Sequence, residues 1–211
     1  HFYPVAAFQD DVTGRVSFAE RRSSGRNLRS LSLRCGQCLG CRLEKSRQWA
    51  IRCVHEASLY EDNSFVTLTY GELPENGSLN YRHFQLFMKR LRRTGRKARF
   101  FMCGEYGEQL FRPHYHACLF GVGFRDKLVM RGGEFPIYSS EELSDLWSLG
   151  HCSVGDVTFE SAAYVSRYVV KKVTGLSAES HYLRVLESTG EVVKVEPEFC
   201  HMSLKPGIGA F

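Results

Sequence analysis

Two strand-like runs joined by a short connection constrain the fold of this chain more than any other feature. The runs ARFFMCG and HYHACLFG cover residues 98–104 and 114–121, and the segment EYGEQLFRP separates them. A parallel pair needs a crossover of about a dozen residues or more, whereas a shorter connection joins antiparallel neighbours. The runs therefore predict an antiparallel sheet in which they are adjacent strands.

The other segments predict helices that do not alternate regularly with strands. Apolar periodicity and capping residues, such as Asn80, mark the helices, and β-branched or aromatic runs mark the strands. Residues 122–138 are rich in glycine and are expected to be irregular. This order favours an α+β fold with a central antiparallel sheet and flanking helices over a doubly wound fold. We expect helices at 42–60, 81–94, 141–150 (closed by Gly150) and 160–173, strands at 3–8, 29–34, 65–70 and 151–157, and a hairpin at 182–197.

Composition narrows the class of protein. A length of 211 residues fits a single domain over 1–211, with a lead-in over 1–41 and a tail over 176–211 that we expect to continue further. No stretch approaches the ~20 apolar residues that a membrane helix needs, and the start lacks the features of a signal peptide. Eight cysteines without such a leader favour a reducing cytosol over secretion.

His114 and His116 lie two positions apart, so their side chains share one face of the predicted strand. Two imidazoles supply half of a divalent-metal site. Glu105 ends the preceding strand and is our candidate for the third ligand, with Glu108 in the connection as the alternative. A mixed nitrogen and oxygen set suits Mn²⁺ or Mg²⁺ acting on a phosphate. Taken alone, the motif fits equally simply a pair of core or surface histidines without a metal.

Two tyrosines follow on a predicted helix. Tyr164, Tyr168, Lys171 and Lys172 fall at positions i, i+4, i+7 and i+8 and form one stripe. A tyrosine attacks a phosphodiester if a metal polarises the phosphate and a nearby cation favours the phenolate, and we expect the lysines to supply that cation. The alternative is that both tyrosines are ordinary core residues. Together with the histidine pair, the stripe predicts cleavage of single-stranded DNA through a phosphotyrosine.

Three cysteines form a separate cluster. Cys35, Cys38 and Cys41 follow a C-x₂-C-x₂-C spacing that is typical of metal ligands. A structural Zn²⁺ site needs four protein ligands, and Cys53 lies ~18 Å further along the predicted helix. An iron–sulfur cluster and reduced packing cysteines are the alternatives. The remaining candidates for a fourth ligand are His1, Cys200 and His201.

Residues 82–99 carry eight basic side chains and no acidic one. Such a field attracts polyanions, although a solvated helix face is an equally good interpretation. Bases of a single strand stack on exposed aromatic rings. The candidates for phosphate contacts are Arg90, Arg92, Arg93 and Lys172, and those for base stacking are Tyr106, Phe111 and Tyr115.

These motifs resemble the HUH endonucleases, and among them the two-tyrosine replication initiators of gokushovirus-type microviruses. The resemblance rests on four segments in the family's order and covers roughly residues 30–210. The segments are CGQCLGCRLEKSRQWAIRCVHEASL, FVTLTY, CGEYGE with RPHYHACLFG, and GDVTFESAAYVSRYVVKK.

The resemblance implies an HUH nuclease fold with a ferredoxin-like core, and rolling-circle replication. One tyrosine becomes linked to the 5′ phosphate, the free 3′-OH primes synthesis, and the second tyrosine releases a unit-length strand. By position, His114 and His116 are the metal ligands, Tyr164 and Tyr168 the nucleophiles, and Lys171 the motif lysine. The implied partners are a single-stranded replication origin and a host helicase and polymerase, and the implied location is the cytoplasm of a bacterium infected by a phage.

Two other functions remain alternatives at this point. A non-catalytic nucleic-acid-binding module predicts no metal-dependent cleavage. An HUH-type transposase or relaxase shares the chemistry but joins different DNA ends.

Overall fold

A computed structural model describes residues 4–18, 28–167, 171–173, 175, 177–186 and 189–210. The chain forms two compact units, residues 1–45 and 46–211. In the first unit, strand β1 (Val5–Asp10) pairs antiparallel with β2 (Val16–Ser17) and with β3 (Leu28–Leu33). Two of these strands correspond to the runs predicted at 3–8 and 29–34.

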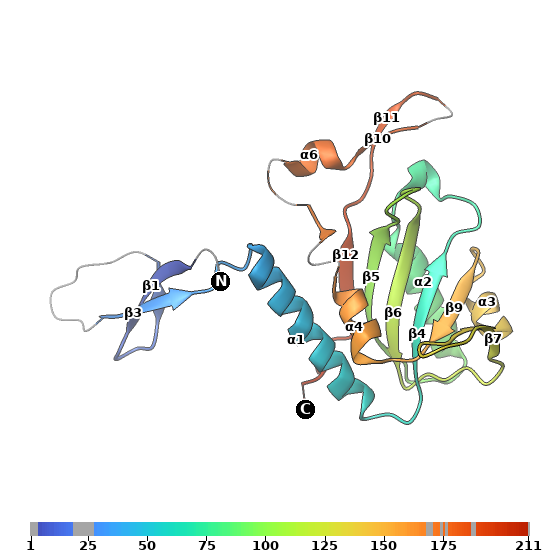
Figure 1. The fold of residues 1–211 in the computed structure, drawn as a ribbon, viewed down its shortest axis with the longest axis horizontal. Helices are drawn as coiled ribbons and strands as arrows, with labels where there is room; N and C mark the ends of the chain where they lie inside the picture. The colour runs from blue at the N-terminus through green and yellow to red at the C-terminus, as the bar shows by residue number, and fades with distance from the viewer. Residues whose placement is uncertain are drawn as a thin grey trace. The chain divides into compact units, whose positions relative to one another are not determined.

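The second unit is built on a seven-stranded sheet in the order β12-β5-β6-β4-β9-β8-β7, and all of its pairings are antiparallel (Figure 1). The predicted α+β class with a central antiparallel sheet is therefore confirmed, and it is consistent with an HUH nuclease fold. The strands are β4 (Asn63–Thr69), β5 (Arg99–Tyr106), β6 (Pro113–Phe120), β7 (Leu128–Arg131), β8 (Ile137–Ser139), β9 (Cys152–Gly155) and β12 (Phe199–Met202).

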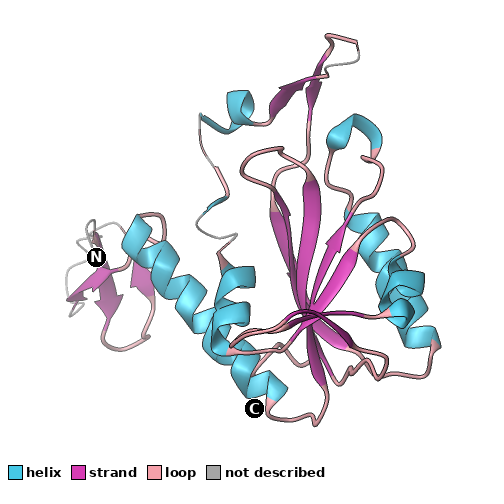
Figure 2. Cartoon of the chain, turned by 45° about the vertical axis from the view of Figure 1, so that its right-hand side comes forward, coloured by secondary structure: helices cyan, strands magenta, loops and turns pink. Residues whose placement is uncertain are grey.

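Helices cover both faces of this sheet (Figure 2). One face packs against α2 (Tyr81–Arg93) and α3 (Glu141–Trp147), which bury Phe84, Phe87 and Trp147 against Leu68 and Tyr115 of the strands. The opposite face packs against α4 (Phe159–Ser166) and the second part of α1 (Leu39–Ala57). Because side chains alternate along a strand, the residues next to Tyr115 on β6 point to the α4 face. That alternation places His114 and His116 under α4.

Capping explains where the helices begin. The Asn80 side chain accepts a hydrogen bond from the Arg82 N–H at the start of α2, as predicted. Ser140 caps α3 in the same way, and Thr158 and Ser161 form a capping box at the start of α4. The helix α1 begins a few residues before its predicted start.

Several predicted boundaries were wrong. The glycine-rich segment 122–138 contains strand β7 and the start of β8, whose hairpin extends the sheet. Helix α3 ends at Ser148, which adopts a left-handed conformation with φ 54°, and not at Gly150. Gly150 is required for a different reason, since a Cβ there would lie 2.0 Å from the Gly71 nitrogen. Strand β12 was not predicted.

The C-terminal part holds a small hairpin and the last strand. Strands β10 (Leu183–Val185) and β11 (Val192–Lys194) pair antiparallel after α6 (Ser177–His181), which confirms the predicted hairpin. Strand β12 then pairs with β5 at the edge of the large sheet. A short 3₁₀ turn, η1 (Glu75–Gly77), lies in the loop before α2. Within the described ranges, none of the helices has the length and apolar character needed to span a membrane.

Candidate metal and tyrosine site

Strands β5 and β6 bring Glu105, His114 and His116 together on the α4 face. Glu105 is paired with His114 in the register of the two strands, as the sequence predicts for antiparallel neighbours. The Nε2 atoms of both histidines lie 3.4 Å from the Glu105 Oε1. Potential ligand atoms of all three residues lie within 4.8 Å of one another. Glu105 and His116 are buried, and His114 is partly exposed.

Second hydrogen bonds orient the two imidazoles. The Nδ1 of His114 lies 3.0 Å from the Arg112 carbonyl oxygen, which can only accept, so Nδ1 donates and the Nε2 lone pair is left toward Glu105. The Nδ1 of His116 lies 3.0 Å from the Thr67 hydroxyl on β4. This arrangement, in which the outer nitrogen is held and the inner nitrogen is available, is typical of metal-binding histidines.

A divalent cation fits these three residues. The buried Nε2 of His116 has no hydrogen-bond partner among the described residues, which is costly for a buried polar atom unless something binds it. Burial opposes ionisation of Glu105, but contacts with His114, His116 and Lys171 outweigh it and hold the pKa of this carboxyl well below its usual range. Burial also lowers the pKa of His116 and keeps it neutral, as a ligand must be.

Tyr164 on α4 lies directly beside the triad. Its ring meets the His116 ring edge to face, with centroids 4.8 Å apart, and the Arg167 guanidinium lies 5.4 Å from its centroid. Burial and the Glu105 charge raise the pKa of the Tyr164 phenol, and the Lys171 charge opposes them only in part. Tyr164, Glu105, His114 and Lys171 all line one cavity of about 470 Å³.

Lys171 contacts the carboxylates. Its Nζ lies 3.0 Å from the Glu105 Oε2 and 3.5 Å from the Glu108 Oε1. The lysine lies beside the metal triad. Burial lowers its pKa, but the carboxylate partners outweigh burial and leave the pKa of Lys171 raised. The Glu108 side chain is 84% exposed, whereas that of Glu105 is 3% exposed. Of the two candidates for a third ligand, the structure brings only Glu105 into the cluster with the histidines.

The predicted helix 160–173 is described only in part. Helix α4 ends at Ser166, and Lys171 still donates its backbone N–H to the Arg167 carbonyl. Tyr168, the second predicted nucleophile, lies outside the described residues. Lys172 lines a different cavity, next to Tyr81 and His201.

The cysteine cluster lies in the first unit. The sulfur atoms of Cys35, Cys38 and Cys41 lie within 4.8 Å of one another, and the Cys38 backbone N–H donates to the Cys35 Sγ at 3.3 Å. The arrangement is compatible with a shared metal ion. Of the candidates for a fourth ligand, His1 lies outside the described residues, and Cys200 and His201 belong to β12 of the other unit.

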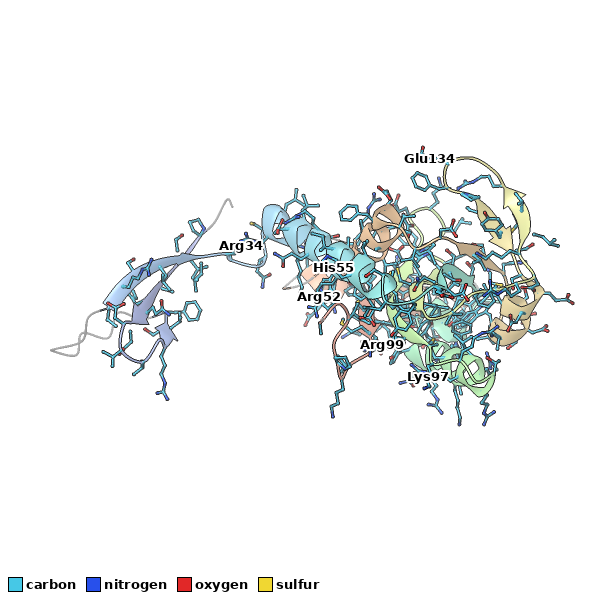
Figure 3. All side chains as sticks on the ribbon, turned by 90° about the horizontal axis from the view of Figure 1, so that it is seen from below. Arg34, Arg52, His55, Lys97, Arg99 and Glu134 are labelled. Atoms are coloured by element: carbon cyan, nitrogen blue, oxygen red, sulfur yellow. The ribbon has the colours of Figure 1, made fainter. Side chains whose placement is uncertain are left out.

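Several of the predicted DNA contacts have structural partners. Arg90 donates to the Leu146 and Trp147 carbonyls at the end of α3, and Arg92 donates to the Ala98 carbonyl. Both lie on α2, on the sheet face opposite the triad, whereas Arg93 is exposed. Figure 3 labels Arg99, another member of this basic run, which binds the buried Glu56 at 2.6 Å.

Two of the three predicted stacking rings are buried. Tyr106 and Tyr115 point to the α2 face, where Tyr115 bonds Tyr70 and the Asn80 backbone, so neither is available to a base. Only Phe111 is exposed, and the Arg184 guanidinium lies 4.2 Å from its ring centroid. The alternation of β5 and β6 explains the error, because one face carries the triad and the other the core.

Two residues that support the site were not predicted. Thr67 holds His116 from the neighbouring strand, and a threonine inside FVTLTY at the same face as Phe65 was the available signal. Tyr182 accepts from the Val173 backbone N–H and donates to Glu198, so it ties the chain after Lys171 to the C-terminal part. Its position far along the sequence carries no local signal. Burial and this carboxylate raise the pKa of Tyr182 to about 12.

The contact from Thr67 leads to a testable prediction. Thr67→Val keeps the shape of the side chain but removes the hydroxyl that orients His116. We expect Mn²⁺ affinity to fall by about 10–100-fold, as is typical when an outer partner of a ligand is lost. Isothermal titration with Mn²⁺ measures this, and Thr69→Val on the same strand serves as the control. Unchanged affinity in Thr67→Val would show that the hydroxyl has no such role.

Comparison with known proteins identifies the family. The model of the replication-associated protein ORF2 family matches residues 63–173, which include the triad and Tyr164. The chain is 34% identical over 194 residues to the replication-associated protein VP4 of Bdellovibrio phage phiMH2K, covering 86% of this chain and 61% of that protein. It is 35% identical over 165 residues to the replication-associated protein ORF4 of Chlamydia phage 1, covering 72% and 41% respectively.

A third relative, the replication-associated protein ORF2 of Spiroplasma virus 4, is 34% identical over 156 residues. The chain spans between 41% and 61% of the length of these relatives. No solved structure gives a significant match. The resemblance to microvirus replication proteins is confirmed, and the chain belongs to the replication-associated protein ORF2 family.

Proposed function

We propose that this protein is a rolling-circle replication initiator that nicks and rejoins single-stranded DNA through a phosphotyrosine. The observation that carries the proposal is the contact of Tyr164 with His116, itself a member of the Glu105, His114 and His116 triad. A packing tyrosine needs no such neighbour. The membership of a replication-associated family favours this function over a transposase or relaxase.

The triad is suited to Mn²⁺ or Mg²⁺, which when bound supplies Lewis-acid polarisation of a phosphate oxygen. The chain's own residues do the rest. Lys171 places a positive charge beside the cavity and attracts the DNA phosphate. The Tyr164 oxygen forms a bond to phosphorus, the bond from phosphorus to the 3′ oxygen breaks, and the phenol proton is lost while the 3′ oxygen gains one.

Because the phosphotyrosine retains the energy of the cleaved diester, rejoining needs no ATP. A second tyrosine one helical turn away, Tyr168, takes over the next transfer in this proposal. The partners we propose are a single-stranded replication origin and a host helicase and polymerase, in the cytoplasm of a phage-infected bacterium.

One experiment tests the function directly. The protein is incubated with overlapping single-stranded oligonucleotides of the phage origin region and Mn²⁺, and adducts that resist denaturation are detected on a gel. We expect a shifted protein band with one oligonucleotide and none with EDTA. Tight binding to DNA without any adduct or nick would instead support the non-catalytic nucleic-acid-binding module.

We also propose that Cys35, Cys38 and Cys41 hold a structural Zn²⁺. Thiolates are preferred zinc ligands, and such sites contribute directly to folding. Cys41→Ser is expected to lose a full equivalent of bound zinc per chain and to lower the melting temperature, as measured by metal analysis and by a thermal scan. Cys152→Ser, which changes a partly exposed cysteine outside the cluster, serves as control. Equal zinc content in the two variants and the unmodified protein would contradict the site.

A further inference from the structure

A second cavity adjoins the candidate active site. It has a volume of about 490 Å³ and lies between α4 and the β7–β8 hairpin. His116 and Tyr164 belong to its lining, so it shares two residues with the site described above. A DNA strand whose phosphate lies at Tyr164 therefore has its neighbouring nucleotide within reach of this cavity.

The walls of the cavity are flat and apolar. Phe65 lies parallel to the His116 ring, with centroids 5.7 Å apart and an interplanar angle of 6°. On the hairpin side the wall is formed by Phe135, Pro136 and Ile137. Phe135 is 51% exposed, although phenylalanine is among the residues most often buried in a folded protein. Aromatic faces of this kind stack with nucleobases, at about 1–3 kcal/mol per base.

The polar groups of the cavity favour a base over a phosphate. Three carboxylates, those of Glu134, Asp156 and Glu160, line it against the single guanidinium of Arg131. This excess of negative charge repels a phosphate. Carboxylate oxygens accept hydrogen bonds from the exocyclic amino group of a base, as Glu and Asp do from cytosine N4.

The other polar side chains in the lining are engaged in the structure itself. Thr158 and Ser161 form the capping box of α4, so their hydroxyls already have partners. Asp156 is paired with Lys127 at 3.8 Å. Glu134 lies in the loop between β7 and β8, at the outer end of the hairpin (Figure 3). It is exposed and is the carboxylate best placed to meet a base at the entrance.

We propose that this cavity binds the nucleobase next to the phosphate attacked by Tyr164, and that it prefers a base with an exocyclic amino group. The inference rests on the proposed function, because it assigns the cavity to the DNA substrate of that site. It makes Phe135 the stacking residue and Glu134 the residue that discriminates between bases.

Binding without cleavage tests the cavity separately from the chemistry. The full chain in EDTA is titrated against fluorescent oligonucleotides of about 15 nucleotides, a length near the upper site size of single-strand-binding folds. The three probes are oligo-dC, oligo-dT and an abasic strand of equal length. We expect affinity to decrease from oligo-dC to oligo-dT to the abasic strand.

Two variants locate the effect. Phe135→Ala is expected to weaken oligo-dC binding by about 5-fold or more, as loss of one stacked base implies, and to leave abasic-strand binding unchanged. Glu134→Gln is expected to reduce the preference of dC over dT. The matched control is Leu128→Ala, an exposed apolar residue of the same hairpin that does not line the cavity.

The outcomes separate the two proposals. If Phe135→Ala weakens all three probes equally, or none of them, the cavity does not bind a base, whatever the adduct assay shows. If the adduct never forms but the base-dependent loss in Phe135→Ala is observed, the cavity stands and the nuclease proposal fails. A preference for oligo-dT over oligo-dC would overturn the role of the carboxylates.

Discussion

A protein in which both Tyr164 and Tyr168 are replaced by phenylalanine is expected to form no covalent adduct with DNA. Each single variant is expected to retain some cleavage, because tyrosines at i and i+4 lie ~6 Å apart and can use one metal site in turn. At Tyr164, phenylalanine keeps the ring that packs on His116 and removes only the nucleophilic oxygen. The readout is the denaturation-resistant adduct with an origin oligonucleotide in Mn²⁺.

The control for this variant is another tyrosine that lies away from the triad. Tyr138→Phe on β8, whose ring contacts Lys127, is expected to form the adduct at the normal level. Binding of uncleaved DNA by the double variant shows that it is folded. An adduct in the double variant would falsify the assignment of the nucleophiles.

Replacing Glu105 by glutamine is expected to remove most of the affinity for Mn²⁺. The change keeps the size of the side chain but removes the only negative charge within the triad, and it leaves Lys171 beside two neutral imidazoles. We expect affinity to fall by more than the ~10–100-fold typical of an outer partner, because a direct ligand is lost. Isothermal titration measures the affinity, and the adduct assay is expected to fall in parallel.

Glu108→Gln is the matched control. Its carboxylate also contacts Lys171 but is 84% exposed and lies outside the triad. We expect this variant to bind Mn²⁺ as the unmodified protein does. If Glu108→Gln loses the metal and Glu105→Gln retains it, the two carboxylates have the opposite roles.

Much of the fold followed from local sequence patterns. The order of elements, the Asn80 cap and the pairing of β5 with β6 were predicted, because a short connection and two-residue alternation leave few other arrangements. Edge strands were harder. The hairpin of β7 and β8 is exposed throughout β7, and β12 pairs with a strand far away in sequence, so neither has the apolar alternation that marks a strand.

The basic run shows the opposite kind of error. Its charge is evident from the sequence, but charge alone does not distinguish a DNA contact from a structural bond. Arg90 and Arg92 donate to backbone carbonyls, and Arg96 and Arg99 bind carboxylates of other elements. A guanidinium carries five donors and satisfies acceptors at helix ends as readily as phosphates.

The sequence by itself determined which residues of β5 and β6 meet, since the spacing of His114 and His116 and the register with Glu105 follow from the geometry of two adjacent strands. Only the tertiary structure decided which groups meet across more distant elements. Thr67 reaches His116 from β4, Tyr164 reaches it from α4, and the β7–β8 hairpin encloses a cavity beside them. The physical reason is that these contacts depend on how separate elements pack, and packing is set by the whole core rather than by any local pattern.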